Sequence, residues 1–421
     1  MRTREVRRRT VLRAAVLGPV AGLAAGCGAM KQAAGLGDYV RVAVSWSATE
    51  LAAFQRVLGS RKDDCKLIPL GDDIDAALGA NLTGRPNVVA LPQPKLVTGN
   101  LDRLSPLPDD VWNSDYDEFW GRQLPSEGGR HYAVPFKLAH SSMVWYRKRL
   151  FREHGLEPPE TWDEWLELND QITERAGVAP LALGGADGWL LARFFENVLL
   201  RHFDGTYAAI IAGERGAWGG ADVRAAFGMV AQMWGAPGAL AGGADRALVA
   251  QYPEAVLEVF RYHRAAMVAA PDFAESVIRS FDVLDGDVGT FTFPAATGFD
   301  RRLVVTGDLL VLTAPPDPAA RELIRYLSTA EAPVPWIRDT GGFIAANPDT
   351  ALGHYSPLIR DRVRELRSHE LQFGLSDKVA LGGVLEESLQ GLLRALAAGT
   401  RPATAAGAAA AAMSDAEKAT A

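Results

Sequence analysis

The sequence predicts an α/β fold in two domains, and three observations support this prediction. The chain has 421 residues, which is enough to bury two hydrophobic cores. Hydrophobic residues make up 48% of it and charged residues 23%, as in ordinary soluble globular proteins. Strand-like and helix-like segments alternate along the chain, which is typical of proteins that layer helices on sheets.

The alternation starts near residue 40. We predict strands or extended chain at Val40–Val44, Cys65–Leu70, Val88–Leu91, Ala133–Tyr146 and Leu303–Leu312, and helices at Ala48–Leu58 and Pro318–Leu327. Thr161, followed three residues later by Glu164, predicts a capping box at the start of another helix. Residues 401–421 are rich in alanine without apolar periodicity, so we expect a frayed helix or a disordered tail.

The first 27 residues have the three parts of an export signal. Six arginines precede a short apolar run, Ala14–Ala25, which is too short to span a bilayer. Arg8-Arg9-Thr10-Val11-Leu12 resembles a twin-arginine signal, although the general export route stays open. Leu23-Ala24-Ala25-Gly26-Cys27 resembles a bacterial lipobox. We therefore expect a lipid on Cys27 that anchors the protein to the extracytoplasmic face of the membrane.

The charge and cysteine content narrow the function classes. Removal of the first 26 residues, with their six arginines and Glu5, takes the net charge from −7 to about −12. This acidity argues against nucleic acid as a partner. If Cys27 carries a lipid, Cys65 is the one remaining cysteine, so disulfides do not hold the chain together. We expect Cys65 to be a small buried residue.

Sequence motifs of catalysis and cofactor binding are missing. The chain contains no HExxH, Walker A, GxSxG or CxxC motif, and no glycine-rich dinucleotide fingerprint follows the first strand. His131 and His140 do not have the spacing of metal ligands on one helix face. We expect no catalytic residue, metal or cofactor, although a pair of glycosidase carboxylates would leave no motif.

Several blocks together resemble the extracellular carbohydrate-binding proteins of ABC importers, especially α-glucoside and maltose-type binders. They run from Val42 to Leu396 and include Val44-Ser45-Trp46, Leu91-Pro92-Gln93-Pro94, Tyr132-Ala133-Val134-Pro135-Phe136-Lys137, Gly184-Gly185-Ala186-Asp187-Gly188-Trp189, Phe195-Glu196-Asn197, Asp272-Phe273, Thr306-Gly307-Asp308, Gly341-Gly342-Phe343 and Ser376-Asp377. Their order and spacing, more than any single block, carry the resemblance.

The resemblance implies a periplasmic-binding-protein-like fold of two α/β lobes joined by a hinge, with the chain crossing between the lobes more than once. The first lobe would use residues 38–138 and 307–348, and the second residues 143–303 and 355–400. A ligand would bind in the cleft between the lobes, which would close by a hinge motion. The expected partners are a small sugar and the permease subunits of the importer, and the protein is expected to act as a monomer.

Seven residues are the candidates for sugar contact, because sugars present an apolar face to aromatic rings and hydroxyls to polar groups. They are Trp46, Gln93, Lys137, Trp189, Asp272, Asp308 and Phe343. Trp46 and Phe343 could equally pack in the core, Gln93 could form a simple turn, and Lys137 could lie on the surface. Glu50 is expected to be a first-turn helix acid, and Asp187 could cap the next helix.

Departures from the family pattern bear on specificity. Asn87 stands where an acid is expected, Lys95 where glycine is common, and Arg193 and Phe194 where an acid and a tryptophan are expected. Arg193 either points outward or adds a cation near the cleft, which would favour an acidic or modified sugar. A sensory or scaffold lipoprotein of the same fold is the second function class, and a secreted glycoside-active enzyme is the third.

Overall fold

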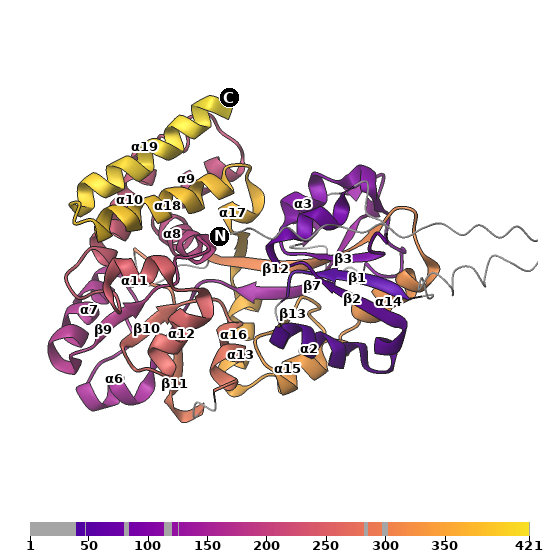
Figure 1. The fold of residues 1–421 in the computed structure, drawn as a ribbon, viewed down its shortest axis with the longest axis horizontal. Helices are drawn as coiled ribbons and strands as arrows, with labels where there is room; N and C mark the ends of the chain where they lie inside the picture. Colours follow the sequence, from indigo (N-terminus) through magenta and orange to yellow (C-terminus); the bar gives the residue numbers. More distant parts are fainter. Residues whose placement is uncertain are drawn as a thin grey trace, which may run out of the picture. The chain divides into compact units, whose positions relative to one another are not determined.

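Two β-sheets organise the part of the chain that the computed structural model describes, which comprises residues 39–46, 48–79, 84–112, 120–124, 126–281, 285–296 and 302–420 (Figure 1). The segment from Val40 onward packs as one unit. The predicted signal segment, with Cys27, lies outside the described residues.

The larger sheet has eight strands among the described residues, in the order β13-β7-β12-β3-β1-β2, with β14 and β4 also paired to β12. The strands are β1 (Val40–Val44), β2 (Cys65–Pro69), β3 (Val88–Leu91), β4 (Leu104–Ser105), β7 (Ala133–His140), β12 (Arg302–Thr313), β13 (Ile344–Ala345) and β14 (Glu370–Phe373). β1 pairs in parallel with β2 and β3, whereas β12 runs antiparallel to β3 and β7. The apolar runs of β1 and β3 are buried, as expected for strands covered on both faces.

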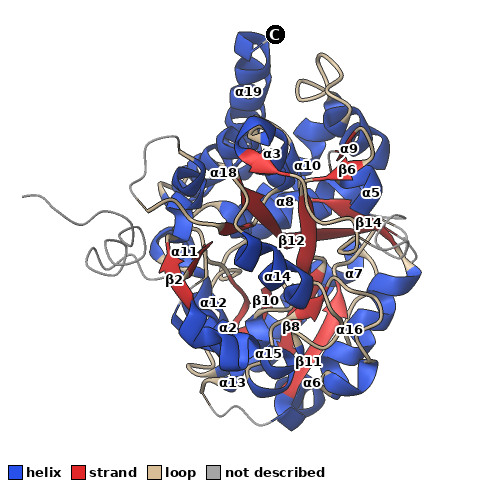
Figure 2. Ribbon diagram, turned by 90° about the vertical axis from the view of Figure 1, so that its right-hand side faces the viewer, coloured by secondary structure: helices blue, strands red, loops and turns tan. Residues whose placement is uncertain are grey.

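The smaller sheet has the order β11-β8-β10-β9, and its strands β8, β10 and β11 can be followed in Figure 2. They are β8 (Met143–Arg147), β9 (Ala179–Ala182), β10 (Ala265–Ala269) and β11 (Val288–Thr292). The chain passes from the larger sheet to the smaller one through Ser141 and Ser142. There Ser141 N–H donates to the Val304 carbonyl at 3.0 Å, and Val304 N–H donates to Ser142 Oγ at 2.8 Å. The crossing after β7 is therefore fixed directly to β12.

Helices cover the sheets. They include α2 (Ala48–Leu58), α3 (Pro94–Thr98), α6 (Lys148–His154), α7 (Trp162–Ala176), α8 (Trp189–His202), α9 (Asp204–Ile211), α10 (Ala221–Trp234), α11 (Gly243–Val249), α12 (Tyr252–Phe260), α13 (Ala274–Arg279), α14 (Pro318–Leu327), α15 (Val334–Asp339), α16 (Pro357–Ser368), α17 (Leu375–Lys378) and α18 (Gly382–Ala397). The predicted capping box is confirmed at α7, where Thr161 Oγ1 accepts from Glu164 N–H and the Glu164 carboxylate accepts from Thr161 N–H.

The alanine-rich end of the chain resolves one open expectation. Of the two expected forms, a frayed helix or disorder, the structure shows a helix, because Pro402–Thr420 form the 19-residue α19. Ala405, Ala409 and Met413 recur every four residues and are buried, and α19 packs on α10 and α18. Alanine has the highest helix propensity, and a stripe of small side chains lets helices approach closely. Because this apolar face is made mostly of alanine, it lacks the large hydrophobic residues by which an amphipathic helix is usually recognised in a sequence.

The lobe boundaries stay a prediction, and the strand pairing does not follow them everywhere. Residues 355–400 were assigned to the second lobe, but β14 within them pairs in parallel with Arg302–Val305 of β12 in the larger sheet. β12 is long enough to reach both β14 and β3, which places different partners on its two halves.

Candidate functional site

A cavity of about 720 Å³, here called the central cavity, is lined by residues from both halves of the described chain. Five of the seven candidate residues line it, namely Trp46, Gln93, Lys137, Trp189 and Asp308. They follow or belong to β1, β3, β7, α8 and β12, so segments far apart in the sequence meet at one place. A hollow of this size fits a small organic ligand.

Trp46 both packs in the core and borders the cavity. Its side chain is buried, with ring centroids 4.8 Å from Phe54 and 5.1 Å from Trp336. Its indole N–H donates a hydrogen bond of 2.9 Å to Oδ2 of Asp308. The two interpretations of Trp46 therefore coexist, because most of the ring is covered and its polar edge is used to hold another candidate residue.

Lys137 is the central cation of the wall contributed by the larger sheet. Its Nζ lies 2.9 Å from Oε1 of Glu50, and its side chain is 5% exposed, so it is not a surface lysine. Burial alone would lower the pKa of Lys137, but the carboxylates of Glu50 and Asp308 outweigh burial and raise it. The pKa of Asp308 is raised by its own burial, against the pull of Lys137 and Trp46. Lys137 thus remains charged.

Glu50 was missed as a cavity residue. It lies in the first turn of α2, as expected from its position, but it also pairs with Lys137 and lines the cavity. Its helix position alone explains why an acid is favoured there, so no local signal marks its second role. Gln93, by contrast, precedes α3 in extended conformation and lines the cavity with a partly exposed amide.

Trp189 begins α8 and is an aromatic residue of the cavity wall. It is half-buried, and its ring centroid lies 5.4 Å from Tyr252 and 5.9 Å from Phe273. The preceding Gly188 has a φ of +79°, and a Cβ at that position would lie 2.9 Å from the Cβ of Glu386. Only glycine fits this turn, because it tolerates positive φ and leaves room for α18. Asp187, one residue earlier, is exposed and also lines the cavity.

Asp272 and Phe343 are not brought to the cavity wall. Asp272 is fully buried, and its Oδ1 accepts from the His140 backbone N–H at 2.6 Å, at the end of β7. Burial raises the pKa of Asp272 to about 7. Phe343 is 1% exposed and packs on Phe136 and Trp336, with centroids 5.1 and 5.0 Å away. The sequence signals were a proline before Asp272 and two glycines before Phe343. Such residues indicate a turn, but the direction of each side chain is set by packing.

Arg193 is resolved in favour of the second alternative, since it lies in the cavity wall and is 6% exposed. Its Nη1 donates to Glu196 Oε2 at 2.6 Å, and its Nη2 donates to Asp377 Oδ1 at 2.7 Å. Burial opposes the charge, but these two carboxylates outweigh it and raise the pKa of Arg193. A Cβ at residue 374 would collide with this guanidinium, which explains Gly374. The guanidinium of Arg193 is therefore paired with two carboxylates of the protein itself.

The wall also contains a bridge between α3 and α17. Lys95 Nζ donates to the Ser376 carbonyl at 2.7 Å, and both Lys95 and Asp377 line the cavity. Ser376 in turn donates from its backbone N–H and its hydroxyl to Glu196, each at 2.8 Å. The unusual lysine at residue 95 therefore connects to the same buried cluster as Arg193.

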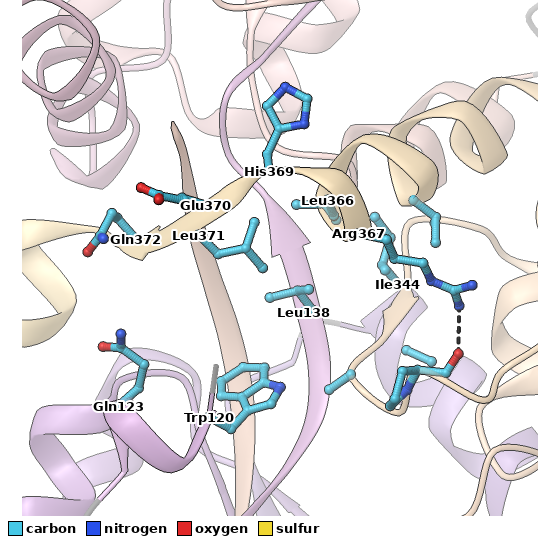
Figure 3. Close-up of a pocket in the computed structure, with 14 residues that line it drawn as sticks. Trp120, Gln123, Leu138, Ile344, Leu366, Arg367, His369, Glu370, Leu371 and Gln372 are labelled. Carbon is cyan, nitrogen blue, oxygen red and sulfur yellow. Dashed lines mark hydrogen bonds between the residues drawn. The ribbon is translucent and has the colours of Figure 1, made fainter. Parts of the chain in front are cut away.

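A second cavity, of about 650 Å³, lies elsewhere and contains none of the seven candidate residues (Figure 3). Its apolar lining includes Trp120, Leu138 and Leu371. Arg367, which also lines it, donates from Nη2 to the Pro348 carbonyl at 2.8 Å. Its polar groups come mainly from β14 and the end of α16.

No group of three or more His, Cys, Asp and Glu side chains in the described ranges is arranged to hold a metal ion. In the part of the chain that the structure describes, no helix combines the length and apolarity needed to cross a membrane.

Comparison with known families defines the class of protein. The model of the bacterial extracellular solute-binding proteins matches residues 87–332, which is more than half of the chain. The chain belongs to this family. The two-lobed α/β fold inferred from the sequence blocks is confirmed by this match and by the solved structures that the chain resembles.

Individual relatives are similar over different spans. An osmoprotective compounds-binding protein, GgtB, of Synechocystis is 24% identical over 69% of this chain and 72% of its own length. An uncharacterised ABC transporter extracellular-binding protein of Pyrococcus horikoshii is 38% identical, but the match spans only 17% of each chain, and a second protein of that organism matches over 23% of its length. The α-glucosides-binding periplasmic protein AglE of Rhizobium meliloti is 33% identical over 28% of both chains.

Solved structures share the fold at low identity. A chitin oligosaccharide binding protein superposes with a TM-score of 0.73 at 18% identity, over 91% of this chain and all of that one. A maltose-bound MalE3 of T. maritima gives a TM-score of 0.67 at 18% identity, over 89% and 98% of the two chains. Both relationships establish the architecture.

Proposed function

We propose that the chain captures a small sugar in the central cavity and delivers it to the permease of an ABC importer, acting as a monomer. The observation that carries this proposal is the composition of the cavity wall, to which the half-buried Trp189 contributes together with Lys137, Asp308 and Gln93. An aromatic face with polar groups around it matches the two surfaces of a pyranose. The names of relatives such as AglE support the same class of ligand.

The charged groups of the wall are held in place before a ligand arrives. Asp308 is fixed by Trp46, and Lys137 is fixed by Glu50. Groups that are already oriented lose little side-chain entropy on binding, which favours affinity. A buried polar wall also discriminates strongly against ligands that lack the matching hydroxyls.

A thermal-shift screen across mono- and oligosaccharides tests the proposal, followed by calorimetric titration of the best ligand. A sugar that binds the folded state alone raises the melting temperature in a concentration-dependent way. The Trp189→Ala variant is the matched control, because it removes the aromatic wall. Absence of any shift across the whole sugar panel would overturn the proposal.

We also propose that binding is not followed by catalysis. The buried carboxylates of the wall are used to hold other groups, since Asp377 pairs with Arg193 and Asp308 accepts from Trp46. The bound sugar should be recovered unchanged after prolonged incubation. Turnover that disappears on substitution of a single cavity carboxylate would assign the protein to the glycoside-active enzymes instead.

The proposed location is the extracytoplasmic face of the membrane, with a lipid on Cys27. The other cysteine, Cys65, begins β2 and is half-buried, and burial raises the pKa of its thiol to about 11. The lipobox-like segment Leu23–Cys27 supports Cys27 as the residue for modification. Cys27→Ala should move the protein from carbonate-washed membranes to the soluble exported fraction, with Cys65→Ala as the control that stays on the membrane. Retention of the Cys27→Ala protein would contradict the anchor.

A further inference from the structure

The central cavity has an excess of acidic groups. Among the residues that the structure describes, six carboxylates and three cationic side chains line it. The acids are Glu50, Asp75, Asp187, Asp308, Asp377 and Glu386. Each of the two buried cations is shared between two carboxylates, since Lys137 interacts with Glu50 and Asp308 while Arg193 bonds to Glu196 and Asp377. The wall is therefore negative even around its positive charges.

This arrangement removes the reason to expect an acidic sugar. Arg193 reaches the wall, but its Nη1 and Nη2 donors are already directed at carboxylates of the protein. An anion placed beside Arg193 would also approach Asp377, whose Oδ2 is buried and has no hydrogen-bond partner among the described residues. Like charges at such distances repel more strongly in a partly buried site than in water.

Glu386 is a further carboxylate of the wall, and its side chain is partly buried. It lies on α18, beside the turn at Gly188 that precedes Trp189. Burial raises its pKa to about 7, with Glu196 and Asp377 adding to the effect of burial and Arg193 and Lys95 opposing it. A carboxylate in this position gains from a cation that the ligand brings.

The neighbouring aromatic side chains favour the same kind of ligand. Trp189, Tyr252 and Phe273 form a cluster with ring centroids 5.2 to 5.9 Å apart. The faces of aromatic rings attract cations, and tryptophan does so most strongly. An ammonium group between an aromatic face and a carboxylate would be stabilised by both.

We infer that the ligand of the central cavity is an amino sugar, whose protonated amine is held between the carboxylate of Glu386 and the ring of Trp189. This inference rests on the proposed function, because it names the sugar class for the same cavity. It also assigns Glu386 to ligand recognition, a role that neither its sequence context nor the block pattern indicates.

Calorimetric titration of the purified full-length protein at pH 7 tests the inference with matched ligands. The probes are glucosamine, 3-amino-3-deoxyglucose, 6-amino-6-deoxyglucose and oligomers of glucosamine, each compared with its hydroxyl counterpart and the oligomers also with their N-acetylated form. At least one amine is expected to bind about tenfold or more tighter than its counterpart. Neutral sugars that bind as well as every amine would overturn the inference and leave the proposed function standing. Binding of no sugar of either class would overturn the proposed function itself.

Two variants locate the amine. Glu386→Gln keeps the shape of the side chain and removes its charge, so the ratio of the affinities for the amine and for its hydroxyl counterpart should fall to about one. Glu387→Gln, at the exposed neighbouring position of α18, should leave the preference unchanged. A preference that persists in Glu386→Gln would overturn the assignment of this residue. Equal melting temperatures of the two variants would establish that folding is not the cause.

Discussion

The indole N–H of Trp46 and the carboxylate of Asp308 form a hydrogen bond of 2.9 Å between segments 262 residues apart. Trp46 follows β1, and Asp308 lies in β12 at an irregularity between Asp308 and Leu309, with β3 between these two strands. Both residues were candidates for sugar contact on separate grounds. The bond makes them one unit, in which the tryptophan fixes the direction of the carboxylate.

We predict that substitutions at Trp46 and Asp308 are coupled. Trp46→Phe leaves a buried acceptor without its donor, and Asp308→Ala leaves the buried indole N–H without its acceptor, so each should lower the free energy of unfolding by about 1–3 kcal/mol. The double variant should lose less than the sum, with a coupling of about 0.5–3 kcal/mol. Urea denaturation of the four proteins measures this coupling. Strictly additive losses would show that the bond does not contribute.

Trp189→Ala should weaken sugar binding more than it weakens folding. The ring is half-buried in the empty cavity, so its removal costs limited packing, whereas a stacked sugar would lose its apolar partner. We expect a loss of affinity of roughly tenfold or more, and Trp189→Phe should retain part of the binding. Unchanged affinity with a sharply lower melting temperature would make Trp189 a packing residue.

Asp272 should affect stability in a pH-dependent way, because it is buried beside the end of β7 rather than on the cavity wall. Its pKa is about 7 in the folded protein against 3.8 in the unfolded chain, so the folded state binds more protons between these values. The free energy of unfolding contributed by this group therefore falls as the pH rises from about 4 to 7 and is lowest above 7.

Asp272→Asn cannot titrate, so its stability relative to the wild type should improve between pH 5 and pH 8. Urea midpoints at the two pH values check this, with the exposed Asp170→Asn as the control that shows no such trend. A stability difference that stays constant with pH would contradict the role given to burial here.

The packing of α19 predicts opposite outcomes for two neighbouring alanines. Ala409 is 5% exposed, whereas Ala408 is exposed. Ala409→Glu would place a charge and extra volume between α19 and its neighbours, and should lower the free energy of unfolding by about 2 kcal/mol or more. Ala408→Glu should change it by less than about 0.5 kcal/mol. Equal melting temperatures for the two variants would mean that α19 does not depend on this face.

Much of the local structure followed from short-range patterns. The strands at Val40–Val44 and Val88–Leu91 and the helices at Ala48–Leu58 and Pro318–Leu327 begin and end where the sequence predicts. The capping box of Thr161 and Glu164 is a contact within four residues, so its physics is complete in the local sequence. The family could also be predicted from the sequence, because the order of short blocks along the chain is a property of the sequence itself.

The site depended on the tertiary structure. Arg193 has its counterion at Asp377, 184 residues away, and Glu386 reaches the cavity because Gly188 lets α18 approach. The same folding turned Asp272 toward the His140 backbone and buried Phe343 among other rings. Periodicity, caps and turn residues report which way a short segment folds, because they act over a few residues. Which side chain faces the cavity, and which charge is already paired, is decided by packing between segments that the chain brings together only when it folds.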